Sequence, residues 1–395
     1  MTLELVFLGI GALLILSVVA ARFGSYFKLP SMLIFIGIGM LLGSEGPGGI
    51  PFDDAELTSE LGLLAMAVII FGAGLSTPFK LVRQAGAPAT SLSTIGVVLS
   101  MGLMAVAAHY LVGMEWIHAL LLGAILAPTD AAAVFAALKE SPLKLPEKLV
   151  SIVEVESATN DPLSIFLVMT ITALAVGQLQ PSWALVFLPI WNILFGAIIG
   201  IALGYLSVLL LRFIRFDLIG FSFLFSIGVA LVAFEGADLL GGNGFLAVYL
   251  CGLVMGNSEL RHKHQLRQLH DANSWLMQVG LFLLLGLLVF PTHLLQIWPM
   301  ALMLGLVLAL LARPLSVMGS LMPFKFPLRD QAALSWAGLR GAAPIVLATI
   351  PLAAGVSQAG LIFNVVFFAV LVSALLQGTT LSTLTGKLFG TAQKE

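Results

Sequence analysis

The chain has 395 residues, of which 59% are hydrophobic and only 10% are charged, whereas soluble domains carry roughly 25% charged residues. Its formal net charge of −2 favours no polyanionic partner, so we expect no nucleic-acid binding. Apolar runs recur from the first residues to the last few, which predicts a single membrane domain over 1–395.

Thirteen transmembrane helices are predicted, because a bilayer requires about 20 apolar residues per helix and the chain divides at proline, glycine and charge clusters. The predicted ranges are 3–23, 31–43, 58–77, 86–112, 115–137, 147–177, 183–212, 217–235, 243–256, 270–290, 296–319, 329–351 and 358–385. No basic residue precedes the first range, which indicates a retained helix rather than a cleaved signal peptide. The fold class that we expect is an all-α integral membrane protein.

Basic residues predict the orientation of these helices, because lysine and arginine are enriched in cytoplasmic connections. They occupy alternate connections, and the connections between contain acidic residues but no lysine or arginine. The connections that we assign to the cytoplasm hold Arg22, Lys28, Lys80, Arg83, Lys139, Lys144, Lys148, Arg212, Arg215, Arg261, Lys263, Arg267, Lys325, Arg329, Lys387 and Lys394. The N-terminus is therefore predicted outside and the C-terminus in the cytoplasm.

An inverted repeat is predicted, since thirteen helices divide into two sets of six joined by a linking helix at 183–212. The fifth helix of each set has a mid-span proline near a charge: Pro128 with Asp130, and Pro344 with Arg340. Proline removes a helix hydrogen bond, and lipid cannot satisfy the freed groups. We expect two crossed, interrupted helices, and the alternative is two simple proline kinks.

The sixth predicted helix carries the densest set of polar residues, among them Ser157 and Asp161. Asp161 lies roughly 20 Å along the helix from its cytoplasmic start, which is close to the membrane midplane. A partly desolvated carboxylate there can hold a proton or a bare cation but hardly both, which is the minimal mechanism of exchange. Oxygen ligands for an alkali cation would come from Asp161, Ser157, Thr129 and water. In the alternative, Asp161 only ties a helix break at Pro162 to a partner.

The remaining charged groups near the midplane are interpreted as structural. A buried charge without a partner is strongly destabilising, so we predict an ion pair between Glu156 and Arg340. Asp130 is expected against the positive end of a half-helix. Asn160 is expected to act as a neutral scaffold, which leaves one ionisable carboxylate at the site and predicts electroneutral exchange. Glu154 is expected to line a solvated funnel.

Glycine patterns elsewhere are interpreted without a functional role. Gly196, Gly200 and Gly204 form a GxxxG run that predicts close helix packing. The glycine-rich stretch at 241–244 is most simply a turn. No stretch has a Walker or dinucleotide-binding pattern, so we expect no cofactor, and no histidine or cysteine arrangement predicts a transition-metal site.

Three motifs resemble those of a known family. Residues 156–161 resemble the ESxxND signature of monovalent cation:proton antiporters of the NhaP and sodium/proton-exchanger type. Residues 128–130 resemble the PTD break of that family, and residues 338–341 resemble its GLRG break. The longer stretches 127–135 and 340–348 are similar to its bacterial potassium/proton branch, called cell volume regulation protein A.

This resemblance covers essentially the whole chain and implies a homodimer in the bacterial inner membrane. It implies an interface part at approximately 1–85 and 217–290, and a mobile core part at 86–177 and 296–385. The cation-binding residues that it implies are Asp161, Ser157, Glu156 and Thr129, and the structural ones are Asn160 and Arg340. Members of the branch usually continue into a cytoplasmic regulatory domain, and we expect none within these residues.

Three other functions remain as alternatives to a secondary antiporter. A channel would need a continuous pore, whereas one alternating carboxylate site needs none. An intramembrane enzyme would need a base near Ser157, and no histidine or lysine is in plausible reach. An anion transporter could use Arg340, although the acid-rich site argues against it. Oxygen ligands suit both sodium and potassium, so the choice between the two ions stays open.

Overall fold

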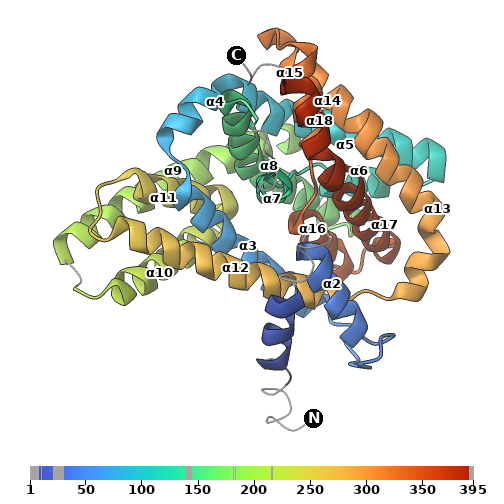
Figure 1. Ribbon diagram of the computed structural model, residues 1–395, viewed down its shortest axis with the longest axis horizontal. Helices are drawn as coiled ribbons and strands as arrows, with labels where there is room; N and C mark the ends of the chain where they lie inside the picture. Colours follow the sequence, from blue (N-terminus) through green and yellow to red (C-terminus); the bar gives the residue numbers. More distant parts are fainter. Residues whose placement is uncertain are drawn as a thin grey trace.

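The computed structural model describes residues 9, 11–20, 31–138, 145–180, 182, 184–214 and 217–390. All of the regular secondary structure in these ranges is helical, in agreement with the predicted all-α class (Figure 1). Every range that was predicted as a membrane helix is mainly helical where it is described. The ends of the first predicted range and the connection at 139–144 lie outside the described residues.

The first half of the chain begins with an apolar helix over Gly11–Ala20. It continues with α2 (Ser31–Leu42), α3 (Ala55–Ser76), α4 (Phe79–Ser91), η1 (Leu92–Gly96), α5 (Val97–Ala107), η2 (Ala108–Val112), α6 (Trp116–Leu126), α7 (Ala131–Leu138), α8 (Glu147–Ala175) and α9 (Ala184–Ile214). The segments η1 and η2 are π-helical turns within a long helical stretch over Phe79–Val112, which is kinked at Gly86, where the backbone is not helical.

The second half of the chain is also a succession of helices. It contains α10 (Ile219–Leu239), α11 (Gly244–Asn257), α12 (Lys263–Leu287), α13 (Pro291–Val307), η3 (Leu308–Ala312), α14 (Arg313–Leu321), η4 (Met322–Phe324), α15 (Leu328–Trp336), α16 (Ala342–Ala353), α17 (Ala359–Val372), η5 (Ser373–Gly378) and α18 (Thr379–Phe389). Here η3 and η5 are π-helical turns inside long helices.

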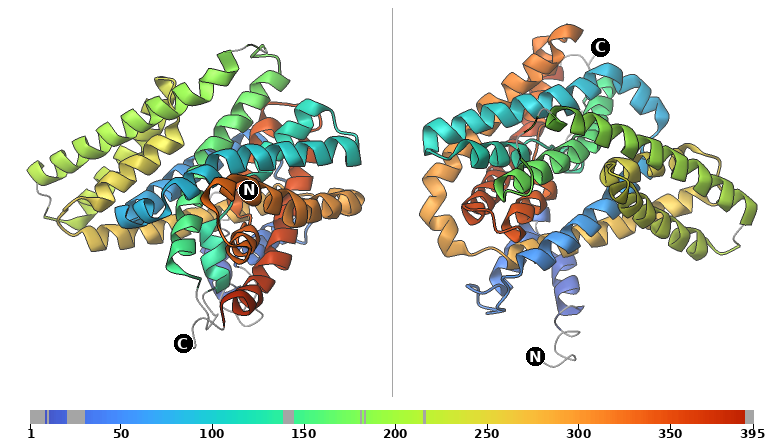
Figure 2. Two further views of the ribbon diagram at one scale, coloured as in Figure 1. Left: turned by 90° about the horizontal axis from the view of Figure 1, so that it is seen from above. Right: turned by 180° about the vertical axis from the view of Figure 1, so that it is seen from behind.

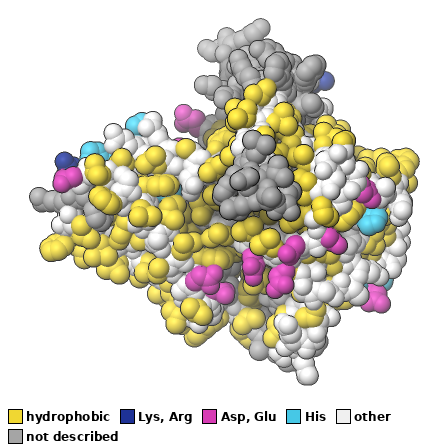
Figure 3. Space-filling model, turned by 90° about the horizontal axis from the view of Figure 1, so that it is seen from below, with side chains coloured by type: hydrophobic (Ala, Val, Ile, Leu, Met, Phe, Trp, Pro, Cys, Tyr) yellow, Lys and Arg dark blue, Asp and Glu magenta, His cyan; other side chains and the backbone are white. Residues whose placement is uncertain are grey.

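Length and composition identify a multi-pass membrane protein. Within the described residues, seven helices are long and apolar enough to cross a bilayer, and an eighth is obtained if α6 and α7 count as one bent span. Four shorter apolar helices accompany them. The surface seen in Figure 3 is largely hydrophobic, with charged side chains in only a few places. The count of thirteen crossings and the orientation of the termini stay predictions.

Close glycine contacts hold α9 against α11. A Cβ atom on Gly200 would lie 2.6 Å from Ala247 Cα, and one on Gly204 would lie 2.8 Å from Val254 Cβ, so larger residues there would force the helices apart. The predicted packing role of this GxxxG run is therefore confirmed.

Figures 1 and 2 show α9, α10, α11 and α12 extending to one side of the molecule, with α13 and α17 on the other.

Two helix breaks meet in the interior. The first separates α6 from α7, which are bent by 47° relative to each other, and the second separates α15 from α16. The backbone N–H of Asp130 in the first break donates to the carbonyl oxygen of Leu339 in the second, at 2.8 Å. A Cβ atom on Gly341 would overlap the Asp130 carboxylate, so only glycine permits this approach. Two interrupted helices are therefore present and their breaks are in contact, whereas their crossing and the inverted repeat stay predictions.

Candidate cation site

Asp161 lies at the end of an accessible stripe on α8. Glu154, Ser157, Ala158 and Asp161 are all partly exposed, and their spacing of three or four residues puts them on one face of the helix. The stripe stops at Asp161, because Ser164, Ile165 and Val168, which continue the same face, are almost completely buried. This face of α8 is therefore partly exposed on the N-terminal side of Asp161 and buried on its C-terminal side.

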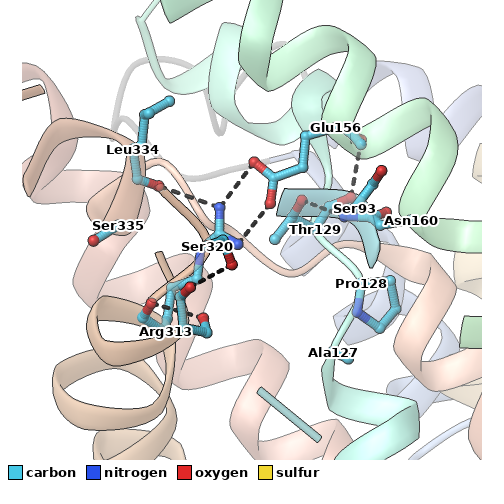
Figure 4. A network of polar contacts seen from close by, with 12 residues as sticks. Ser93, Ala127, Pro128, Thr129, Glu156, Asn160, Arg313, Ser320, Leu334 and Ser335 are labelled. Carbon is cyan, nitrogen blue, oxygen red and sulfur yellow. Dashed lines mark hydrogen bonds and ion pairs between the residues drawn. The ribbon is translucent and has the colours of Figure 1, made fainter. Parts of the chain in front are cut away.

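The first break supplies the backbone that faces this stripe. Ser157 Oγ donates to the carbonyl oxygen of Thr129 at 2.9 Å and accepts from the N–H of Ala131 at 2.9 Å. Asn160 Nδ2 donates to Thr129 Oγ1 at 2.8 Å. Ser157, Thr129 and Asn160, which the sequence predicted at the site, thus lie together. Asn160 joins α8 to the break as a scaffold would, and Figure 4 shows it beside Thr129.

Asp130 caps the half-helix that follows the first break. Its Oδ1 accepts from the N–H of Ala133 at 3.1 Å, in the first turn of α7. The carboxylate therefore satisfies a backbone donor that has no partner within the helix, and it lies at the positive end of the helix dipole. This is the position that the sequence predicted for Asp130.

The predicted ion pair between Glu156 and Arg340 is wrong, because Glu156 pairs with Arg313 instead. Arg313 Nη1 donates to Glu156 Oε1 at 2.6 Å and Nη2 donates to Oε2 at 3.1 Å, a bidentate contact between nearly fully buried side chains. Arg313 Nη2 also donates to the carbonyl oxygen of Leu334 (Figure 4). The pair joins α8 to α14, not to the second break.

Arg340 has other partners, which explains why it is not available to Glu156. Its Nη1 donates to the carbonyl oxygens of Ala127 at 3.0 Å and Pro128 at 2.7 Å, and its backbone N–H donates to Ser373 Oγ at 3.1 Å. These two carbonyls belong to the first break and have no helical partner. The guanidinium of the second break therefore satisfies the backbone that the first break exposes.

Several polar atoms around Asp161 lack partners among the described residues. Asp161 Oδ1 and Asn160 Oδ1 are buried and accept no hydrogen bond, and Arg340 Nε and Nη2 donate none. Buried polar atoms are rarely left unsatisfied, so these oxygens favour a ligand or water. Carboxylate, amide, hydroxyl and carbonyl oxygens are the donors that a hard cation prefers.

Two contacts at the boundary of the site were not predicted. Asn243, at the N-terminus of α11, donates from Nδ2 to the carbonyl oxygen of Pro162 at 2.9 Å, although the sequence suggested only a turn there. Thr77 Oγ1 approaches Glu154 Oε1 at 3.5 Å, at the other end of the accessible stripe. Arg313 lies within the predicted helix at 296–319, but the sequence does not reveal which neighbouring helix its side chain faces.

Comparison with known proteins gives the family. The transmembrane sodium/hydrogen exchanger family matches residues 11–387. The chain belongs to this family. The chain also has the fold of the sodium proton antiporter MjNhaP1 from Methanocaldococcus jannaschii, with a TM-score of 0.85, 22% sequence identity and 99% of this chain covered against 100% of that chain.

Curated relatives of the chain are named as antiporters. It is 39% identical over 385 residues to the K(+)/H(+) antiporter NhaP of Alkalimonas amylolytica, and 41% identical over 384 residues to the K(+)/H(+) antiporter NhaP2 of Shewanella sp. strain ANA-3. These matches cover 96% and 95% of this chain. The chain spans 66% and 65% of the length of these two relatives.

Proposed function

We propose that this protein is a secondary antiporter that exchanges a monovalent alkali cation for a proton at Asp161. The observation that carries the proposal is the position of this carboxylate, which ends an accessible stripe, has an unpartnered buried oxygen and lies beside two helix breaks. The chain also belongs to a family of exchangers, and relatives covering almost all of it are named as potassium/proton antiporters.

Competition for one carboxylate is the proposed mechanism. When a cation arrives from the open side, it displaces the proton from Asp161 and completes its shell with Ser157, the Thr129 oxygens and water. Glu156 is assigned a structural role, because both of its oxygens are engaged by Arg313. Asn160, Asp130 and Arg340 hold the breaks. With one ionisable carboxylate, one positive charge travels each way and exchange is electroneutral.

Alternating access would come from movement of one part of the protein past the other. The proposed moving part contains 86–177 and 296–385, which include both breaks and α8. The proposed stationary part contains 1–85 and 217–290, and it would form the contact of a homodimer in the bacterial inner membrane. The sharp change of exposure at Asp161 along α8 supports access from one side at a time.

Potassium is the cation that the comparisons favour. Relatives of 39% to 41% identity are named as potassium/proton antiporters, whereas a relative of 29% identity from Synechocystis is named as a sodium/proton antiporter. A channel is disfavoured by the closed C-terminal side of the site. An anion transporter is disfavoured because Glu156 engages Arg313 and because the site is rich in carboxylates.

The test is exchange by purified protein in liposomes that contain a pH-sensitive dye. With the membrane voltage clamped, addition of potassium should drive protons across the membrane, and Asp161→Asn should show no response. Sodium is added in a parallel experiment to determine which cation is exchanged. A native protein that responds to neither cation, or an Asp161→Asn variant that responds fully, would remove the proposal.

A further inference from the structure

Three hydrogen bonds connect α8 to residues of the proposed stationary part, and they differ in length. Two of them are at the limit of a hydrogen bond: Thr77, just after α3, approaches Glu154 at 3.5 Å, and Ser151 approaches Gln84 at 3.5 Å.

The third is shorter. Asn243 of α11 donates to the carbonyl oxygen of Pro162 at 2.9 Å and is only 5% exposed. The two weaker contacts lie toward the N-terminal end of α8, and the stronger one lies beside Asp161.

The backbone around Asn243 is built to hold its side chain in place. Its Oδ1 accepts from the N–H of Leu246 at 2.9 Å, so the same amide caps α11 and reaches α8. Its own N–H donates to the carbonyl oxygen of Asn192 in α9 at 2.9 Å. The neighbouring glycine, Gly244, lies against the backbone of Phe234, where a Cβ atom would come within 2.6 Å of the carbonyl oxygen. Asn243 is therefore fixed to α9 and α10 while it holds α8.

The closed side of the site begins where this bond is made. Pro162 directly follows Asp161, and the next residues on the same face, Ser164 and Ile165, are 0% and 1% exposed. If Asp161 is to face the C-terminal side of α8, this stretch must leave its present neighbours, and the carbonyl of Pro162 must separate from Asn243.

We propose that the hydrogen bond from Asn243 to Pro162 is a latch that keeps the C-terminal side of the cation site closed, and that it breaks each time Asp161 turns to that side. The proposal rests on the proposed exchange function. Asn243 is a positioning residue in this scheme, since it contacts neither cation nor proton. Loss of the latch destabilises the present conformation relative to the opposite one and shifts the population between them.

Asn243→Ser is the variant that separates the latch from helix capping. Serine is also a favourable N-cap, so α11 keeps its start, but its short side chain lacks the amide that donates to Pro162. The matched control is Asn192→Ser, which removes a side-chain hydrogen bond to Gly241 in the same turn without touching α8. Both variants should fold and retain exchange.

The first readout is the apparent KM for the cation, measured separately at each membrane face in oriented vesicles. Asn243→Ser should raise the KM at the face open to the N-terminal side of α8 and lower it at the other face. The expected change is about threefold to tenfold, which corresponds to one buried hydrogen bond. Opposite shifts of the two KM values distinguish a latch from a general loss of function, because a general loss would lower the KM at neither face. Unchanged KM values, or shifts in the same direction, would overturn the proposal.

The second readout does not depend on exchange. Cys251 is the only cysteine, so a Cys251→Ser background permits a single reporter at Ser164→Cys. A membrane-impermeant thiol reagent should label this reporter faster from the C-terminal side of α8 in Asn243→Ser than in the native background or in Asn192→Ser. Equal labelling in all three would overturn the latch. If the native protein shows no exchange, the proposed function fails, and this comparison still decides the latch.

Discussion

At the scale of single residues, the buried pair of Glu156 and Arg313 shows how a carboxylate is accommodated in the interior of this protein. Both side chains are at least 95% buried, and two hydrogen bonds join them. Breaking such a pair by removing one partner typically costs about 3–5 kcal/mol, because the remaining charge stays buried without compensation. The pair therefore fixes α14 against α8 next to the cation site.

Arg313→Ala should lower the thermal unfolding temperature of the detergent-purified protein by a large margin, since it leaves Glu156 unpaired. Arg329→Ala is the control, because Arg329 is 60% exposed and its contact with Asp330 is at 3.6 Å. Exposed pairs contribute only about 0–1 kcal/mol, so this variant should unfold near the native temperature. Equal stability of the two variants would contradict the role given to Arg313.

A second residue-scale prediction concerns pH and the connection between α2 and α3. The hydroxyl and the backbone N–H of Thr292, at the start of α13, both donate to Glu45 and lower the pKa of its carboxyl below 4.5. Because the folded pKa is lowered, this stabilisation is complete above the unfolded pKa and is lost as the pH falls through the folded pKa.

Glu45→Gln should therefore unfold at a lower temperature than the native protein at neutral pH, and the difference should shrink as the pH drops below 4.5. The measurement is thermal unfolding of both proteins across that range. Glu60→Gln serves as the control, since Glu60 makes no side-chain hydrogen bond within the described part of the chain. A difference that persists unchanged in acid would argue against the contact with Thr292.

At the scale of elements, the contact between the two breaks depends on a glycine. Gly341→Ala should push the Asp130 carboxylate from its place at the start of α7 and thereby disturb the Thr129 and Ser157 contacts. We expect loss of most exchange activity in the liposome assay. Gly102→Ala in α5 is the control, because a Cβ atom there meets nothing within 4 Å, and helical alanine is favoured over glycine. Full activity of Gly341→Ala would contradict the proposed crossing.

The sequence predicted the elements well because their signals are local. Apolar length placed the helices, and Pro128 and Pro344 indicated the two breaks. The pairing of Glu156 was predicted wrongly because it depends on which side of a helix faces a distant neighbour. Arg313 directly follows the π-helical turn η3. A π-helical turn rotates the following residues around the helix axis, so the spacing of apolar residues in the sequence does not reveal which way Arg313 faces.

The role of Asn243 could not be read from the sequence for a related reason. A glycine-rich stretch predicts a turn by itself, but the position of that turn in the protein interior depends on the packing between α9 and α11. Only this packing brings the amide beside Pro162. Residue types near Asp161 were therefore predictable, whereas contacts between helices far apart in sequence required the three-dimensional arrangement.

At the scale of the whole molecule, α8 is partly exposed on the N-terminal side of Asp161 and buried on its C-terminal side, and Asp161 Oδ1 has no hydrogen-bond partner among the described residues. The predicted orientation would make the exposed side cytoplasmic, because α8 is predicted to begin there. The proposed antiporter needs no pore, only two conformations that expose the same site in turn. In the proposed mechanism, cation and proton exclude each other at Asp161.

The most direct test of that claim is proton release at equilibrium, without any membrane. Potassium or sodium is added to detergent-purified protein in weak buffer near the pH at which exchange is fastest, and a pH indicator reports released protons. We expect about one proton for each cation bound by the native protein, and none from Asp161→Asn. Cation binding without proton release in the native protein, or unchanged release from Asp161→Asn, would contradict competition at this carboxylate.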